Sequence, residues 1–87
     1  MYVVIIYDVG VSRIGRVRKY LKQYLDWVQN SALEGEITKA EYIKIRSTLR
    51  KMIKTNEDSI MIYSVSSQKF MDKEVLGIEK GETDVII

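Results

Sequence analysis

The feature that most constrains the fold is the run from Tyr2 to Tyr7, in which every residue is aromatic or β-branched. A continuous run of this kind predicts a strand that is covered on both faces. The whole chain has 87 residues, which is enough for one compact domain over residues 1–87 and too few for two. Because a domain this short buries only about 60–65% of its unfolded surface, we expect association with a second copy to add stability.

Helical and strand patterns alternate along the rest of the chain. Apolar residues at helical spacing predict a helix over 12–25, and residues 27–37 fit either one kinked strand or two short strands. Thr38 and Glu41 form the capping-box pattern at the start of a second helix. The buried stripe of that helix is expected to be Tyr42, Ile45, Leu49, Met52 and Ile53.

Three further strands are predicted in the last third, over 59–66, 75–79 and 83–87. This element order predicts an α+β, ferredoxin-like fold with two helices on one face of an antiparallel sheet. An apolar strand at the end of a chain frays unless it is docked. We expect residues 83–87 to dock either on their own sheet or on the edge of a second copy, which would build a dimer.

The composition excludes several kinds of catalytic site. The chain has no Cys, which rules out disulfides, a thiolate nucleophile and a thiolate zinc site. It also has no His, the usual general acid or base near pH 7 and the commonest transition-metal ligand. Its glycines form no phosphate-binding loop motif. Chemistry must therefore depend on carboxylates, hydroxyls, Lys, Arg or a hard metal ion.

Charge is distributed unevenly along the chain. Residues 1–54 carry eleven Lys or Arg and five acids (11 − 5 = +6), whereas residues 55–87 carry three and seven (3 − 7 = −4). The basic residues gather in the two predicted helices, over 13–22 and 44–54. Such clusters indicate a polyanionic partner, although a solvated helix face explains them equally well. The candidate nucleic-acid contacts on the first helix are Arg13, Arg16, Arg18, Lys19 and Lys22.

Asp8 is the candidate for metal chemistry. It directly follows the first predicted strand, where an aspartate commonly caps a turn. It also suits Mg²⁺, which takes one or two protein carboxylates and completes its shell with water and substrate phosphate. A two-fold dimer with both copies of Asp8 near the axis would supply two carboxylates, and a metal-bound water could act as nucleophile without histidine.

Three segments in a fixed order carry a family resemblance. They are the strand that ends in Tyr7-Asp8-Val9 before a basic helix, the block Val-Gln-Asn-Ser-Ala-Leu-Glu-Gly over 28–35, and the strand over 59–63. Together they resemble the CRISPR-associated protein 2 family, the small partner of the integrase that acquires spacers. The resemblance extends from Met1 to the final strand.

The resemblance implies a ferredoxin-like homodimer whose last strand crosses to the partner's sheet, with Asp8 facing its symmetry mate and binding Mg²⁺. Members of the family are described as metal-dependent endonucleases acting on RNA or double-stranded DNA, and also as non-catalytic bridges that hold a DNA duplex between integrase dimers. By this resemblance Asp8 and Arg16 match catalytic positions, and Tyr7 and Ser31 match positions near the site. Arg13 is a looser match.

Two positions depart from the family pattern. Trp27 stands where the family often has Arg, which removes a phosphate or transition-state contact. Leu33 stands where it often has Phe, and this change is expected to affect packing more than chemistry.

A different kind of function competes with the nuclease and adaptor alternatives. A ferredoxin-like module can bind single-stranded RNA through aromatic residues on its central strands. Tyr2, Tyr7 and Tyr63 form no clear pattern of that kind, so this alternative ranks below the others. The chain has no apolar run that could cross a bilayer and no signal-peptide pattern, so we expect a cytoplasmic protein without a membrane partner.

Overall fold

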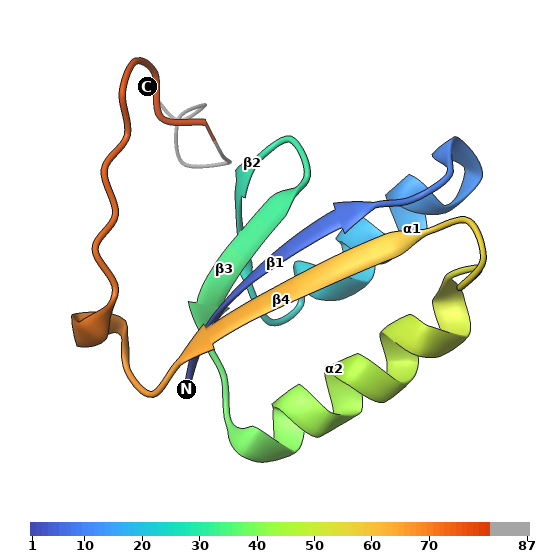
Figure 1. Ribbon diagram of the computed structural model, residues 1–87, viewed down its shortest axis with the longest axis horizontal. Helices are drawn as coiled ribbons and strands as arrows, with labels where there is room; N and C mark the ends of the chain where they lie inside the picture. The colour runs from blue at the N-terminus through green and yellow to red at the C-terminus, as the bar shows by residue number, and fades with distance from the viewer. Residues whose placement is uncertain (81–87) are drawn as a thin grey trace.

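The computed structural model describes residues 1–80, in which two helices lie on one face of an antiparallel sheet (Figure 1). The elements in chain order are β1 (Tyr2–Asp8), α1 (Val11–Leu21), β2 (Asp26–Gln29), β3 (Ala32–Glu36), α2 (Lys39–Met52), β4 (Ser59–Val65) and the short 3-10 helix η1 (Gln68–Phe70). Across residues 1–80 the strand order is β2-β3-β1-β4, and every neighbouring pair is antiparallel. The predicted ferredoxin-like fold is therefore confirmed.

β1 lies in the centre of the sheet, and its alternate residues face the helices. Val3, Ile5 and Tyr7 are at most 3% exposed. They pack in one core with residues of β3, α1 and α2, namely Leu33, Val17, Leu21, Ile45 and Leu49. The other face of the sheet carries Val4 and Ile6, which the helices leave partly exposed.

The two helices differ in how well the sequence predicts their ends. α2 begins with the predicted capping box, in which the Thr38 hydroxyl accepts from the Glu41 N–H at 3.0 Å and the Glu41 carboxylate accepts from the Thr38 N–H at 2.8 Å. α1 ends at Leu21, although its apolar spacing continues to Leu25. Leu25 is buried although it lies in the turn after α1, where its N–H donates to the carbonyl of Leu21. The helix stops before Leu25 because the chain must reverse there to enter β2.

Residues 27–37 form two short strands, which settles the alternative left open by the sequence. β2 and β3 pair through Asp26–Glu34 and Trp27–Leu33, and the register shifts between Trp27 and Gln29. The turn at residues 30–31 joins them. Gly35 lets β3 pass close to the chain before β2, since an added Cβ would come within 3.1 Å of Leu25 Cδ2.

The prediction of a strand over residues 75–79 is wrong. Within residues 1–80 this segment pairs with no strand, and it runs beside β3 and β2 after leaving η1 (Figure 1). Gly77 has φ +92°, a left-handed conformation that interrupts an extended strand, and Leu76 and Ile78 are more than 80% exposed. The strand predicted over 83–87 lies outside the residues that the structure describes.

Candidate nucleic-acid interface

Asp8 is exposed at the carboxyl end of β1. It pairs with Ser59 of β4 in the sheet register. Strand alternation places it with Val4 and Ile6, on the face that points away from the helices. A carboxylate at this position is open to a ligand or to a second molecule that covers the sheet.

Tyr7, next to Asp8, points to the opposite side and holds a polar cluster together. Its hydroxyl donates to the Asn30 carbonyl at 2.9 Å and accepts from Arg18 Nε at 2.8 Å. Arg18 Nη2 and Trp27 Nε1 also donate to the Asn30 carbonyl, at 3.3 and 3.4 Å. The Arg18 guanidinium lies over the Trp27 ring, 4.8 Å from its centroid. These contacts fix the β2–β3 turn against α1 and the end of β1.

Ser31 contributes to the site through its backbone. Its carbonyl accepts from the Tyr7 N–H at 2.9 Å, immediately before Asp8. The fold thus brings the two predicted near-site residues, Tyr7 and Ser31, together beside Asp8.

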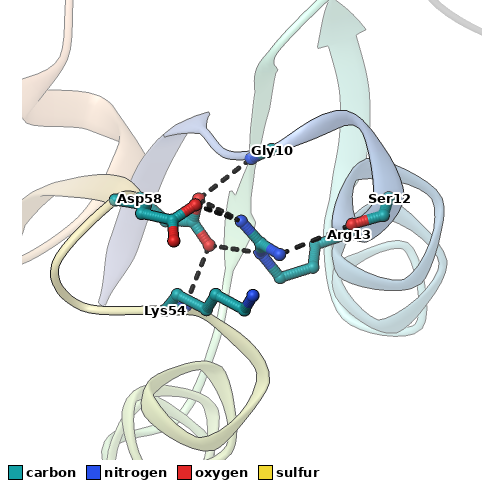
Figure 2. Close-up of polar contacts among 6 residues, drawn as sticks. Gly10, Ser12, Arg13, Lys54 and Asp58 are labelled. Carbon is teal, nitrogen blue, oxygen red and sulfur yellow. Dashed lines mark hydrogen bonds and ion pairs between the residues drawn. The ribbon is translucent and has the colours of Figure 1, made fainter.

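Arg13 is committed to an internal ion pair (Figure 2). Its Nε donates to Asp58 Oδ2 at 2.5 Å and its Nη2 to Asp58 Oδ1 at 2.9 Å. The Asp58 carboxylate also accepts the N–H groups of Gly10 and Lys54, each at 2.9 Å. The hydrogen bonds from Arg13, helped by those backbone donors, hold the pKa of Asp58 well below its usual range. The pair ties the start of α1 to the turn that follows α2.

The ion pair with Asp58 argues against the predicted role of Arg13 as a nucleic-acid contact. The Arg13 side chain is only 10% exposed, and the Asp58 side chain is 1% exposed. A buried guanidinium already bound by a carboxylate cannot contact a phosphate without breaking the pair, so we leave Arg13 out of the proposed interface. No local sequence pattern marks Asp58, because its partner Arg13 lies 45 positions away.

The other cations of α1 have different surroundings. Arg16 and Lys19 are exposed, and within residues 1–80 neither forms a hydrogen bond or an ion pair. Arg18 belongs to the Tyr7 cluster, and the Lys22 ammonium lies 5.9 Å from the centroid of the Trp27 ring. Arg16 and Lys19 are therefore the α1 cations most open to a phosphate backbone.

Asp8 and Arg16 are both exposed, and in the part of the chain that the structure describes no hydrogen bond or ion pair joins them. Asp8 lies at the end of β1 on the sheet face turned away from the helices, and Arg16 lies on α1. The pairing of these two side chains in one catalytic site therefore stays a prediction.

No group of three or more carboxylates that could hold a metal ion is present among residues 1–80. Asp8 can supply one carboxylate to a magnesium ion, and a second copy of the chain would supply another.

No helix within residues 1–80 is long and apolar enough to span a bilayer.

Comparison with known proteins identifies the family. Residues 1–73 match the sequence profile of the family described as CRISPR associated protein Cas2. The chain belongs to this family. It is 51% identical over 87 residues to the CRISPR-associated endoribonuclease Cas2 of Methanosarcina acetivorans, covering 100% of both chains. It is 48% identical to the protein of the same name from Pyrococcus furiosus, again over the full length of both.

Solved structures of the Cas2 family have the same fold. A crystal structure of a Cas2 protein superimposes with a TM-score of 0.83 at 44% identity, covering 92% of this chain and 90% of that chain. Streptococcus pyogenes Cas2 superimposes with a TM-score of 0.75 at 33% identity, covering 88% of this chain and 100% of that chain.

The two departures from the family pattern have distinct places in the structure. The Arg18 guanidinium lies over the Trp27 ring, so a cation from α1 lies next to the position where the family often has Arg. Leu33 is fully buried opposite Ile5 of β1 and belongs to the core.

Proposed function

We propose that this Cas2-family chain works as a homodimer that binds nucleic acid in the spacer-acquisition machinery of a CRISPR system, and that it cleaves RNA or duplex DNA at a site built around Asp8. The observation that carries the proposal is the exposed Asp8 at the end of β1, directly after the Tyr7 that anchors the β2–β3 turn. The relatives named endoribonuclease, at 51% and 48% identity over the full chain, support the cleavage of phosphodiester bonds.

The open face of the sheet supports a dimer. Met61 and Tyr63 of β4 are 48% and 55% exposed, and they are paired with Ile6 and Val4 of β1. Apolar side chains spread over one sheet face favour a covering partner, and a second copy supplies the same surface. Because Asp8 belongs to this face, a two-fold axis near the end of β1 would bring two Asp8 carboxylates together.

The free edge of β4 supports exchange of a strand between the two copies. Within residues 1–80 no strand pairs with the outer side of β4, whose backbone groups are open to a further strand. A hollow of about 240 Å³ lies beside this edge, and Arg46 and Arg50 of α2 border it together with Thr55 and the apolar side chains of Leu49, Ile53, Ile60 and Ile62. The apolar terminal sequence Asp84-Val85-Ile86-Ile87 has the composition to occupy such a position from a partner chain.

In the proposed site, separate residues would bind the phosphate backbone, position Asp8 and hold the metal ion. Arg16 and Lys19 would hold the phosphate backbone, and Tyr7 and the Ser31 carbonyl would fix the strand end from which Asp8 projects. Mg²⁺, which needs the carboxylates of both copies, would supply a water activated for attack on phosphorus.

A second candidate function is a duplex-bridging adaptor that holds DNA between two integrase dimers. The observation that favours it is that Asp8 and Arg16 share no hydrogen bond or ion pair within residues 1–80, while the exposed cations of α1 are open to a duplex. In this case the cations of α1 hold the duplex, and Asp8 serves the interface between the copies.

Cleavage of labelled RNA and duplex DNA, with and without Mg²⁺, separates the two candidates. The wild type should be compared with Asp8→Asn and with Asp26→Asn, which alters another exposed carboxylate at a sheet position, after all three are shown to have the same mass in solution. Magnesium-dependent cutting that is lost only in Asp8→Asn supports the nuclease. Absence of cutting by the wild type, or equal cutting by Asp8→Asn, supports the adaptor.

A further inference from the structure

The outer face of α2 is basic, and the site at the end of β1 makes no use of it. Six cations on or just after this helix are exposed, namely Lys39, Lys44, Arg46, Arg50, Lys51 and Lys54. The one acid in the sequence of α2, Glu41, caps the start of the helix. No carboxylate of the helix itself therefore balances this face.

Helix stability does not account for these charges. Arg46 and Arg50 are four residues apart in the helix, a spacing at which like charges weaken a helix. The helix dipole favours Arg50 and Lys51 in the last turn, but its effect fades within one turn and does not reach Lys44. A ligand that carries negative charge would offset the repulsion along the middle of the helix.

The two arginines of this face are available for such a ligand. In residues 1–80 the side chains of Arg46 and Arg50 form no hydrogen bond and no ion pair, while the Arg46 guanidinium lies 5.5 Å from the centroid of the Tyr42 ring. Stacking on a ring steadies a guanidinium and leaves its N–H groups free to bind. Both arginines border a hollow of about 270 Å³ on the outside of α2, together with Ile43, Ser47 and Lys51.

The position of α2 connects this surface with the basic residues of α1. Both helices cover the same face of the sheet (Figure 1), so Arg16 and Lys19 of α1 belong to the same outer layer as Arg46 and Arg50. The other face of the sheet carries carboxylates, including Glu34 opposite Val4 in the register. Positive charge is thus concentrated on the helix layer.

We propose that α2 is a second contact surface for the sugar–phosphate backbone, so that nucleic acid lies against the helix layer and not against the open face of the sheet. This inference rests on the proposed function, that the chain binds nucleic acid. Arg46 and Arg50 would each bind a phosphate, and the Ser47 hydroxyl between them would add a neutral donor.

The alternative occupant is an acidic protein. The surface favours a phosphate backbone, because a protein docking site has an apolar centre from which charged residues are depleted. Here the hollow is bordered by three cations, and Ile43 is its one aliphatic residue. The basic layer also continues onto α1, as an extended polyanion requires.

Binding of a fluorescent DNA duplex at 50 and 200 mM salt tests the inference. The variant is Arg46→Gln with Arg50→Gln, and the matched control is Lys69→Gln with Lys80→Gln, which removes the same charge from exposed residues outside the helix layer. Each phosphate contact contributes about 0.9 to the slope of log affinity against log salt, so losing two contacts from one chain lowers the slope by about 1.8, and losing two from each chain of a dimer lowers it by about 3.6. Between the two salt concentrations, the wild type should therefore lose about 12-fold more affinity than the variant if one chain contacts the duplex and about 150-fold more if both do, and the control should match the wild type.

A third variant, Arg16→Gln with Lys19→Gln, separates the two levels of the proposal. If it weakens binding while the α2 variant behaves as the wild type, α2 is not a contact surface but the chain still binds nucleic acid. A wild type that fails to bind duplex at 50 mM salt overturns both. If the α2 variant keeps its duplex affinity and loses affinity for polyglutamate, the partner is an acidic protein and the inference is wrong. Equal helical circular dichroism shows that α2 is intact in each variant.

Discussion

Removing one hydroxyl group tests whether the cluster around Asn30 holds the end of β1 in place. Tyr7→Phe keeps the ring, which is 3% exposed, and deletes the hydrogen bonds to Arg18 Nε and to the Asn30 carbonyl. A hydrogen bond to a charged group is worth about 1.5–3 kcal/mol and a neutral one about 0.5–1.5 kcal/mol. The Asn30 carbonyl keeps two other donors, and half-buried Arg18 can recruit water. We therefore expect a loss of about 1.5 kcal/mol.

For a domain of this size, each kcal/mol shifts the melting temperature by about 4–8 °C, so Tyr7→Phe should melt roughly 6–12 °C below the wild type. Circular dichroism during heating measures the shift, at one protein concentration because association alters apparent stability. Tyr63→Phe is the matched control, since Tyr63 is 55% exposed on the open sheet face and, within residues 1–80, its hydroxyl has the Met61 sulfur as its one hydrogen-bond partner, at 3.8 Å; both proteins are compared at the same association state. It should stay within about 0.5 kcal/mol of the wild type.

The pairing of Tyr7 with Arg18 can be measured separately. A double-mutant cycle of Tyr7→Phe with Arg18→Met should give a coupling energy of at least about 0.5 kcal/mol, because the two groups are in direct contact. A Tyr7→Phe protein as stable as the Tyr63→Phe control, or a coupling energy near zero, would refute the role assigned to the cluster.

Three other substitutions give simple stability tests. Arg13 holds the pKa of Asp58 below its ordinary value, so the ion pair stabilises the fold above about pH 4 and this stabilisation is lost as the pH falls. Asp58→Asn should therefore lower the melting temperature at pH 7, and should lower it by less at pH 2. Burial, and then the hydrogen bond to Glu34, raise the pKa of Tyr2 to about 12. The folded protein then keeps a proton that the unfolded chain loses above about pH 10, so stability should fall between pH 10 and 12, and Tyr2→Phe should flatten that fall in urea titrations. Thr38→Ala removes the cap of α2 and should cost about 1 kcal/mol in urea unfolding, and an unchanged midpoint would contradict the cap.

Local sequence patterns predict the elements that depend on neighbouring residues. The run from Tyr2 to Tyr7 becomes the central strand, and the Thr38–Glu41 capping box starts α2 as expected. These signals succeed because the strand preference of β-branched and aromatic residues and capping hydrogen bonds act over a few positions, although Val4 and Ile6 on the second face of β1 are partly exposed. The strand predicted over 75–79 fails because Gly77 adopts a left-handed backbone conformation and the apolar side chains of Leu76 and Ile78 pack against no core within residues 1–80.

In the candidate site, too, the features set by local sequence were predicted and those set by distant contacts were not. Asp8 could be selected from its place at the end of the first strand, and Tyr7 and Ser31 because a resemblance marked them; the fold places the three together. The pairing of Arg13 with Asp58 depends on how the start of α1 meets the turn after α2, which no local pattern specifies. For that reason the sequence presented a buried structural arginine as a surface contact.

The requirement for two copies of Asp8 is the central claim about the site, and subunit mixing measures it directly. Equal amounts of wild type and Asp8→Asn, allowed to exchange subunits, should form about one quarter wild-type dimers by random pairing. If cleavage needs both carboxylates, the mixture should cut RNA or duplex DNA at about one quarter of the rate measured for wild-type protein at the same total protein concentration. A rate of about one half would show that each chain acts alone and would contradict a site shared between two copies.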